Sequence, residues 1–204
     1  MSQAWQGLVF LGSGDYHHLT LALLRGIKVQ FNLVVLDWHL DMYPALPGMV
    51  SCGSWLRDVL SWSRVKAVYV LGVKPNIPET LPAEAGSKLE VYPYFAFAPA
   101  AEALPEKLAG QAVYISLDKD VLASPFAWTN WDQGRLSRYS VLALLASLRQ
   151  KACVIGVDVC GEICPASVLP GPAEAKRMAA NEEINLRLVD LFKGDRQGRQ
   201  GASA

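Results

Sequence analysis

The chain has 204 residues, about half of them hydrophobic, with 19 basic and 19 acidic side chains. That length suits one domain with a substantial core, and the balanced charge gives no footprint for nucleic acid or a membrane surface. No segment supplies the roughly 20 uninterrupted apolar residues of a membrane span, and the N-terminus lacks signal-peptide features. Four cysteines do not make a disulfide framework in such a chain. We therefore expect a reduced, cytoplasmic protein.

Short apolar runs alternate with helical patterns along the chain. In chain order they predict a strand at 7–12, a helix at 17–26, a strand at 31–37, a helix at 55–62, a strand at 66–73, a strand at 89–97 that Pro93 interrupts, a brief amphipathic turn or helix at 102–110, a strand at 111–118, a helix at 137–150, a strand at 152–159 and a long helix at 172–192. Continuous Val, Ile and Leu runs between helices are typical of a parallel sheet covered on both faces. We predict a three-layer α/β/α fold with a mainly parallel sheet, in a single domain over 1–192, and a polar, disordered tail over 193–204.

Acidic or imidazole side chains follow four of the predicted strands. The segments are "GSGDYHH", "LDWHLD", "SLDKD" and "GVDVCGE", and they include all three histidines of the protein. Ligands of open parallel sheets bind beyond the carboxyl ends of the strands, so these side chains are candidate site residues. In an extended segment, side chains two apart face the same side. The side chains expected to converge are therefore Asp37, His39 and Asp41 in one segment, and Asp118 and Asp120 in another.

Carboxylates this close together predict a bound cation. They repel one another and cannot all stay ionised cheaply in a partly buried cleft. Two divalent cations relieve the repulsion better than one, because one carboxylate can bridge both. Hard oxygen ligands with one or two imidazoles favour Mn²⁺, with Fe²⁺, Co²⁺ or Zn²⁺ as alternatives. Two such ions about 3.5–4 Å apart would make a bridging water nucleophilic near neutral pH.

These four segments resemble the signatures of the arginase and agmatinase family of ureohydrolases: Gly-Gly-Asp-His, Asp-Ala-His-x-Asp, Ser-x-Asp-x-Asp and a late Glu. The resemblance covers about residues 8–165. It implies an arginase-like fold, a dinuclear manganese centre, and hydrolysis of a guanidino or amidino C–N bond by the bridging hydroxide. It also implies a small-molecule substrate and admits a homo-oligomer. The implied metal ligands are His17 (or, as an alternative, His18), Asp37, His39, Asp41, Asp118 and Asp120, and the implied substrate-binding acid is Glu162.

The sequence departs from the family pattern in ways that bear on catalysis. The first and last motifs each carry one extra residue, and the histidine that serves in proton transfer downstream of Asp-x-His-x-Asp has no counterpart. The segment "SCGSW" stands there, so Cys52 becomes the candidate catalytic residue, with Ser54 nearby. Asn130 and Asp132 of "TNWDQG" are candidate substrate-binding residues, although a turn accounts for them equally well.

Cys160 and Cys164 flank Glu162 and are interpreted as ordinary packing residues.

Three other functions stay open. A metal-binding protein of the arginase fold without catalytic activity fits the missing histidine, and deacetylases of related architecture keep amide hydrolysis open. Dinucleotide binding fits the "GSG" after the first strand, with Asp37 as the ribose-binding acid. That last interpretation lacks a third glycine and leaves Asp118 and Asp120 unexplained.

Overall fold

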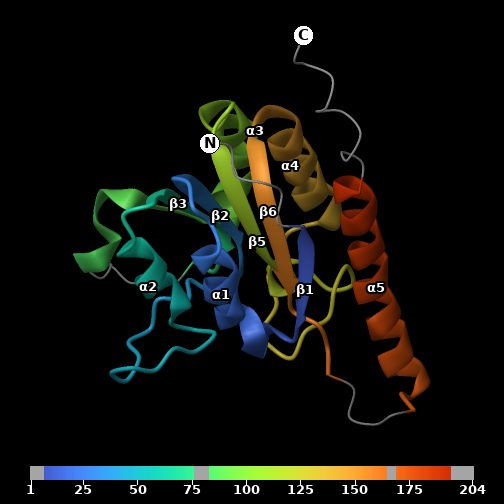
Figure 1. Cartoon of the computed structure of the whole chain (residues 1–204). Helices are drawn as coiled ribbons and strands as arrows, with labels where there is room; N and C mark the ends of the chain where they lie inside the picture. Colours follow the sequence, from blue (N-terminus) through green and yellow to red (C-terminus); the bar gives the residue numbers. More distant parts are fainter. Residues whose placement is uncertain (1–6, 76–82, 165–168, 194–204) are drawn as a thin grey trace.

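The computed structural model describes residues 7–75, 83–164 and 169–193. Its strands form a six-stranded sheet in the order β1-β6-β5-β2-β3-β4, and every pairing between neighbours is parallel (Figure 1). The strands are β1 (Leu8–Gly12), β2 (Phe31–Leu36), β3 (Val65–Val73), β4 (Leu89–Pro93), β5 (Ala112–Asp118) and β6 (Cys153–Cys160). The predicted parallel sheet is confirmed.

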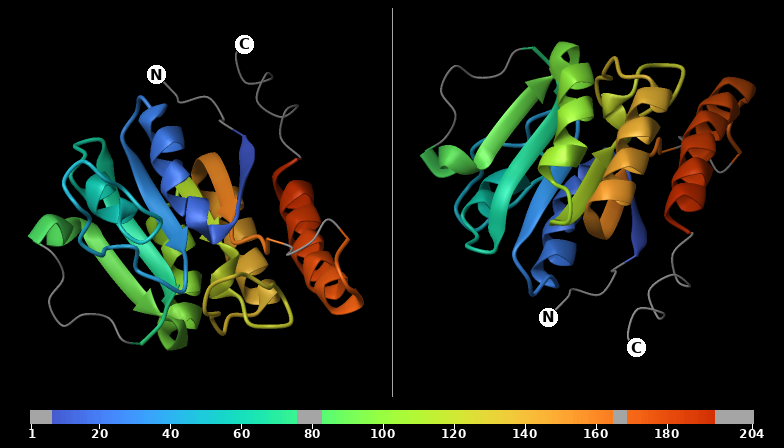
Figure 2. Two further views of the ribbon diagram at one scale, coloured as in Figure 1. Left: turned by 90° about the horizontal axis from the view of Figure 1, so that it is seen from below. Right: turned by 90° about the horizontal axis from the view of Figure 1, so that it is seen from above.

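Helices cover both faces of the sheet (Figure 2). The α-helices are α1 (Thr20–Arg25), α2 (Trp55–Leu60), α3 (Phe97–Lys107), α4 (Arg138–Lys151) and α5 (Pro172–Phe192), and the 3₁₀ helices are η1 (Gly14–Leu19), η2 (Ala83–Lys88), η3 (Tyr94–Ala96) and η4 (Lys119–Val121). Every residue of β2 is buried, and its side chains alternate between two apolar clusters. Val34 and Leu36 pack with α3, α4 and α5, whereas Leu33 and Val35 pack with α1 and α2. This is the predicted three-layer arrangement.

Three predicted elements differ from the structure. The strand expected over 89–97, with an interruption at Pro93, ends at that proline. The brief turn or helix expected over 102–110 is the longer helix α3, which already begins at Phe97. Proline has no N–H for the ladder, and Phe97 reaches the core from a helix instead of a strand. The helix expected over 17–26 starts as the 3₁₀ turn η1, and only Thr20–Arg25 is α-helical. Apart from Lys193, the predicted polar tail lies outside the described residues. In the described part of the chain, no helix is long and apolar enough to cross a membrane.

The connections leave β2 and β5 in opposite directions. From β2 the chain passes through α2 to β3 on one side, and from β5 it passes through α4 to β6 on the other. The two strands pair in register from Asn32 opposite Val113 to Leu36 opposite Leu117. Open parallel sheets bind their ligands just beyond such a switch point. Asp37 follows the last residue of β2, and Asp118 is the last residue of β5.

Candidate metal centre

His17 enters the switch point from η1, and its side chain is almost fully buried. Its Nδ1 atom lies 3.2 Å from Oδ2 of Asp37, 3.0 Å from Oδ2 of Asp41 and 3.8 Å from Oδ2 of Asp118. Its other ring nitrogen, Nε2, lies 2.9 Å from the hydroxyl of Ser116. One imidazole nitrogen therefore faces three carboxylates, while the other is held inside the protein.

The segment after β2 brings its three predicted residues together, but not as an extended strand. Asp41 has a left-handed backbone (φ 50°), which Asp tolerates better than most residues. Its carboxylate contacts His17 and accepts a hydrogen bond from the indole N–H of Trp55 at 2.7 Å. His39 turns the other way, with Nδ1 2.8 Å from Oδ2 of Asp120 and 3.7 Å from Oδ1 of Asp37. Asp37 therefore lies between the two histidines.

The two acids of β5 and η4 complete the cluster. Asp118 has its carboxylate beside His17, and its Oδ1 accepts a hydrogen bond from the backbone N–H of Asp120 at 2.9 Å. Asp120 accepts one from the backbone N–H of Trp38 at 3.1 Å. Three groups of donor atoms result, each within 4.8 Å. They are His17 with Asp37 and Asp41; Asp37 with His39 and Asp120; and His17 with Asp118 and Cys160.

The electrostatics of the cluster fit cations. Burial, with the charges of Asp41 and Asp120, raises the pKa of Asp37 well above its usual range. Burial and the charge of Asp120 raise the pKa of Asp118 to about 7. Burial alone would lower the pKa of His39, but Asp120 and Asp132 outweigh it and raise that pKa to about 9. Without a cation these buried acids hold protons or draw them onto the imidazoles. Oxygen and nitrogen donors of this kind suit hard to borderline divalent metals.

The cluster forms the floor of a cavity of about 330 Å³. Such a volume suits a small-molecule ligand. The cavity is lined by Gly14, His17, Asp37, His39, Asp41, Tyr43, Ser51, Cys52, Gly53, Asp118, Asp120 and Trp131. Cys52 is thus at the cavity, as expected, and burial together with the charge of Asp41 raises the pKa of its thiol. Thiol reactivity needs a lowered pKa, so its environment does not favour a thiolate nucleophile.

Glu162 is not brought to the cavity. The backbone N–H of Glu162 donates to the carbonyl of Gly12 at 2.9 Å, and its carboxylate contacts the ammonium group of Lys119. The preceding residue, Gly161, has a φ of 86°, and a Cβ there would lie 2.5 Å from Oδ1 of Asp118. The left-handed turn at this extra residue of the motif thus brings the backbone against Asp118, and Glu162 follows on the α5 side.

Two of the remaining candidates, Asn130 and Asp132, have partners inside the protein. Asn130 donates to Oδ2 of Asp15 at 3.0 Å and does not line the cavity. Asp132 lies 2.5 Å from Nε2 of His39 and accepts a hydrogen bond from the indole of Trp38 at 3.1 Å. It therefore orients a histidine of the cluster. His18 belongs to none of the donor groups found among the described residues.

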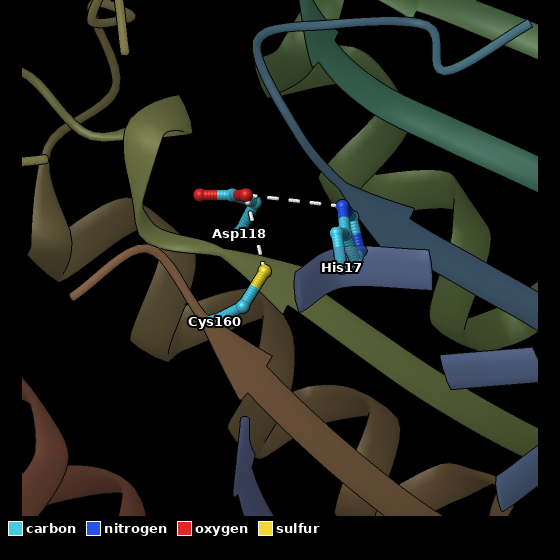
Figure 3. Close-up of side chains that lie close together, drawn as sticks. All are labelled: His17, Asp118 and Cys160. Atoms are coloured by element: carbon cyan, nitrogen blue, oxygen red, sulfur yellow. Dashed lines mark hydrogen bonds and ion pairs between the residues drawn. The ribbon is translucent and has the colours of Figure 1, made fainter. Parts of the chain in front are cut away.

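Several residues of the site were missed in the sequence. Ser116 and Asp158 lie behind His17, and Lys119 is fully buried against Glu162. Cys160 was interpreted as a packing residue, yet its Sγ lies 3.1 Å from Oδ2 of Asp118 (Figure 3). The sequence pointed to Asp158 and Cys160 only by their position, because both belong to the segment "GVDVCGE" at the end of a predicted strand. Only strand pairing brings them to β5, where Asp118 is in register with Cys160.

Comparisons with known proteins identify the family of the chain. The model of the arginase family matches residues 3–171. An uncharacterized protein from Thermotoga maritima is 31% identical over 91% of this chain and 68% of its own length. An agmatinase from Halalkalibacterium halodurans is 26% identical over 88% of this chain and 63% of its own length. The chain thus spans about two thirds of the length of these relatives.

A solved structure, proclavaminate amidino hydrolase from Streptomyces clavuligerus, superposes with a TM-score of 0.69 over 91% of this chain and 65% of that chain. Its 24% identity supports a likeness of fold alone. The parallel sheet and the acids and imidazoles at its switch point define an α/β protein of the arginase-like class. More specifically, the chain belongs to the arginase family.

Proposed function

We propose that the protein is a metal-dependent hydrolase that acts on a C–N bond of a guanidino or amidino compound. One observation carries the proposal: Asp37 belongs to two donor groups at the floor of the same cavity. Its Oδ2 faces His17 and its Oδ1 faces His39. A carboxylate with one oxygen toward each group is suited to bridge two cations. Membership of the arginase family supports the reaction class.

The residues present fit two divalent cations. One would be held by His17, Asp37 and Asp41, and the other by Asp37, His39 and Asp120, with Asp118 beside the first group. The oxygen-rich donor set favours Mn²⁺. Bound there, such ions would supply Lewis-acid polarisation of the substrate and activation of water.

The chain's own side chains shape and equip the cavity around that centre. Trp131 lies edge-on to the ring of His39, at 5.8 Å between centroids, and lines the cavity with Tyr43. Asp132 holds Nε2 of His39, which leaves Nδ1 facing Asp120 and Asp37. Cys52 keeps its proton and lines the cavity, so we assign it as the candidate proton carrier. A Cys52→Ser variant that retains metal and fold but loses turnover would support that assignment.

A second function is favoured by the position of Glu162. This acid, implied by the family resemblance to grip the guanidinium group, contacts Lys119 and lies outside the cavity lining. A chain that binds metal without turning over a guanidino compound has no need of a free acid there. Metal binding without catalysis, or hydrolysis of an amide, is therefore the alternative proposal.

Metal analysis of the purified protein tests the proposal. We expect about two transition-metal ions per chain in the wild type and a large loss in Asp37→Asn, because Asp37 belongs to both groups. The matched control is Asp190→Asn, an exposed position on α5, which should keep its metal. A wild-type protein that binds no metal after growth with Mn²⁺ would contradict the proposal.

A substrate screen then separates the two functions. Guanidino, amidino and amide compounds are supplied to the metal-loaded protein, and the release of urea, ammonia or a carboxylate is measured. Urea or ammonia released by the wild type and not by Asp37→Asn supports the hydrolase. Full metal content without turnover of any guanidino or amidino compound favours the alternative.

A further inference from the structure

A thiol that does not line the cavity borders the candidate metal centre. Cys160 is the last residue of β6 and pairs in parallel register with Asp118, the last residue of β5. Its Sγ donates to Oδ2 of Asp118 at 3.1 Å, and Nδ1 of His17 lies 3.8 Å from the same oxygen (Figure 3). The three residues offer donor atoms within 4.8 Å of one another, and all three are buried.

The surroundings of Cys160 differ from those of a packing cysteine. Its strand neighbours Val157 and Val159 belong to the apolar cluster beneath α3, α4 and α5, whereas Cys160 belongs to neither apolar cluster. Its sulfur meets a carboxylate and an imidazole, and it is fully shielded from solvent. Packing alone therefore does not account for its position.

His17 is held so that it can act as a ligand beside this thiol. The hydroxyl of Ser116 donates its proton to Oδ1 of Asp158 at 2.7 Å, and Asp158 also accepts from Thr20 at 3.1 Å. Ser116 must then accept a hydrogen bond from Nε2–H of His17, 2.9 Å away. In neutral imidazole the other nitrogen, Nδ1, carries the lone pair. That nitrogen faces Oδ2 of Asp41 at 3.0 Å, of Asp37 at 3.2 Å and of Asp118 at 3.8 Å. A buried acid and a serine therefore fix the ligating tautomer, as outer partners of metal-bound histidines do.

We propose that Cys160 is a metal ligand that, with Asp118, joins His17, Asp37 and Asp41 around the first cation, so that this site offers nitrogen, oxygen and sulfur donors suited to Zn²⁺, Co²⁺ or Fe²⁺. The inference rests on the metal dependence proposed above and refines which metal the protein takes. On binding, a metal–sulfur bond forms, the S–H bond breaks, and the proton leaves to the buffer. Thiolate ligands select softer metals than carboxylates do. The group of Asp37, His39 and Asp120 has no sulfur and keeps its preference for Mn²⁺.

Cobalt spectroscopy of the full-length protein tests the proposal directly. The protein is stripped of metal with a chelator and titrated with Co²⁺, while the visible d–d bands and the near-ultraviolet sulfur-to-cobalt charge-transfer band are recorded. We expect the charge-transfer band in the wild type. In Cys160→Ser the d–d bands should remain and the charge-transfer band should disappear. Cys153→Ser is the matched control, because it changes the first residue of the same strand, and it should retain both.

Two other outcomes of this titration overturn the inference. If the charge-transfer band disappears in Cys52→Ser and persists in Cys160→Ser, the cavity thiol is the ligand. If the wild type binds Co²⁺ with d–d bands but without a charge-transfer band, no thiolate is bound, and the metal proposal stands without this refinement. A wild type that binds no Co²⁺ at all contradicts both proposals.

A competition between metals measures the consequence for selectivity. The affinities for Zn²⁺ and Mn²⁺ are compared in wild type and Cys160→Ser, after thermal unfolding has confirmed that both metal-free proteins fold. We expect the substitution to lower the preference for Zn²⁺ over Mn²⁺ by about tenfold or more, since even outer partners of metal ligands contribute 10–100-fold. An unchanged ratio would overturn the proposed role of the sulfur.

Discussion

The ammonium group of Lys119 contacts Oε1 of Glu162, and this ion pair joins the chain after β5 to the chain after β6. Lys119 is fully buried, while the side chain of Glu162 is 29% exposed. Two amides of α5 complete the group, with Asn185 donating to Oε1 at 2.7 Å and Asn181 donating to Oε2 at 3.1 Å. Because Lys119 lies between Asp118 and Asp120, the pair fixes the segment that carries both candidate ligands.

Removal of the Lys119 ammonium group should therefore destabilise the protein. We expect Lys119→Met to lower the free energy of unfolding by about 3 kcal/mol, because Glu162 is left partly buried without its counter-charge. Addition of Glu162→Gln should recover part of that loss. Urea unfolding of the metal-free proteins measures both. The control is Lys107→Met, which breaks an exposed pair with Glu90 and should change stability by about 1 kcal/mol or less.

The single variant Glu162→Gln discriminates between two roles of this acid. A positioning role predicts that Glu162→Gln lowers both stability and metal content. A substrate-binding role predicts unchanged stability and metal content with a raised KM for a guanidino substrate. The second result would contradict the contacts seen between Glu162, Lys119 and α5.

Gly161 should be intolerant of a side chain. In Gly161→Ala the new Cβ would lie 2.5 Å from Oδ1 of Asp118 and 2.8 Å from the backbone nitrogen of Lys119. Gly110→Ala is the control, since Gly110 also has a positive φ (69°) but no atom within 4 Å of a Cβ. We expect Gly161→Ala to lose about 1–3 kcal/mol more stability than the control, along with metal content. Equal losses would show that only backbone strain matters there.

Asp132 should affect one half of the metal centre. Asp132→Ala removes the carboxylate 2.5 Å from Nε2 of His39 and frees that ring to rotate. We expect metal affinity of the group around His39 to fall about 10–100-fold. Calorimetric titration with Mn²⁺ should show one weakened site and one retained site. Asn130→Ala, in the same loop but bonded to Asp15 and Ser13, should titrate like the wild type.

Without bound metal, the protein should lose stability as the pH rises. Burial places the pKa of Asp118 at about 7 and that of Asp37 well above its usual range. An acid with a raised folded pKa adds stability below its unfolded value, about 3.9, and that stability is lost as pH rises toward the folded value. The metal-free protein should thus become less stable from about pH 4 to about pH 7.

Bound cations need the ionised acids, so their stabilising effect should grow over the same range. The measurement is the difference in Tm between metal-loaded and chelated protein, taken at about pH 5 and about pH 7. We expect the difference to be larger at the higher pH. A difference that shrinks with rising pH would contradict the assignment of these acids as ligands.

The layer architecture could be read from local patterns. Parallel strands buried on both faces have continuous apolar runs, and β2 and β5 show them. The sequence also indicated that Asp37, Asp118 and His17 would meet, because strand ends share one edge of the sheet. It predicted a strand over 89–97 with an interruption at Pro93, whereas β4 ends at Pro93 and Phe97 begins α3.

By itself, the sequence determined the fold class and which acids and imidazoles follow the strands, since both depend on residues close together in the chain. Only the tertiary structure decided which of them share a donor group. Strand register puts Cys160 opposite Asp118, and the turn at Gly161 directs Glu162 to Lys119 instead of the cavity. Those outcomes depend on contacts between β5, β6 and α5. More than 40 residues of sequence separate Asp118 from Cys160 and Lys119 from Glu162. No local periodicity encodes such contacts.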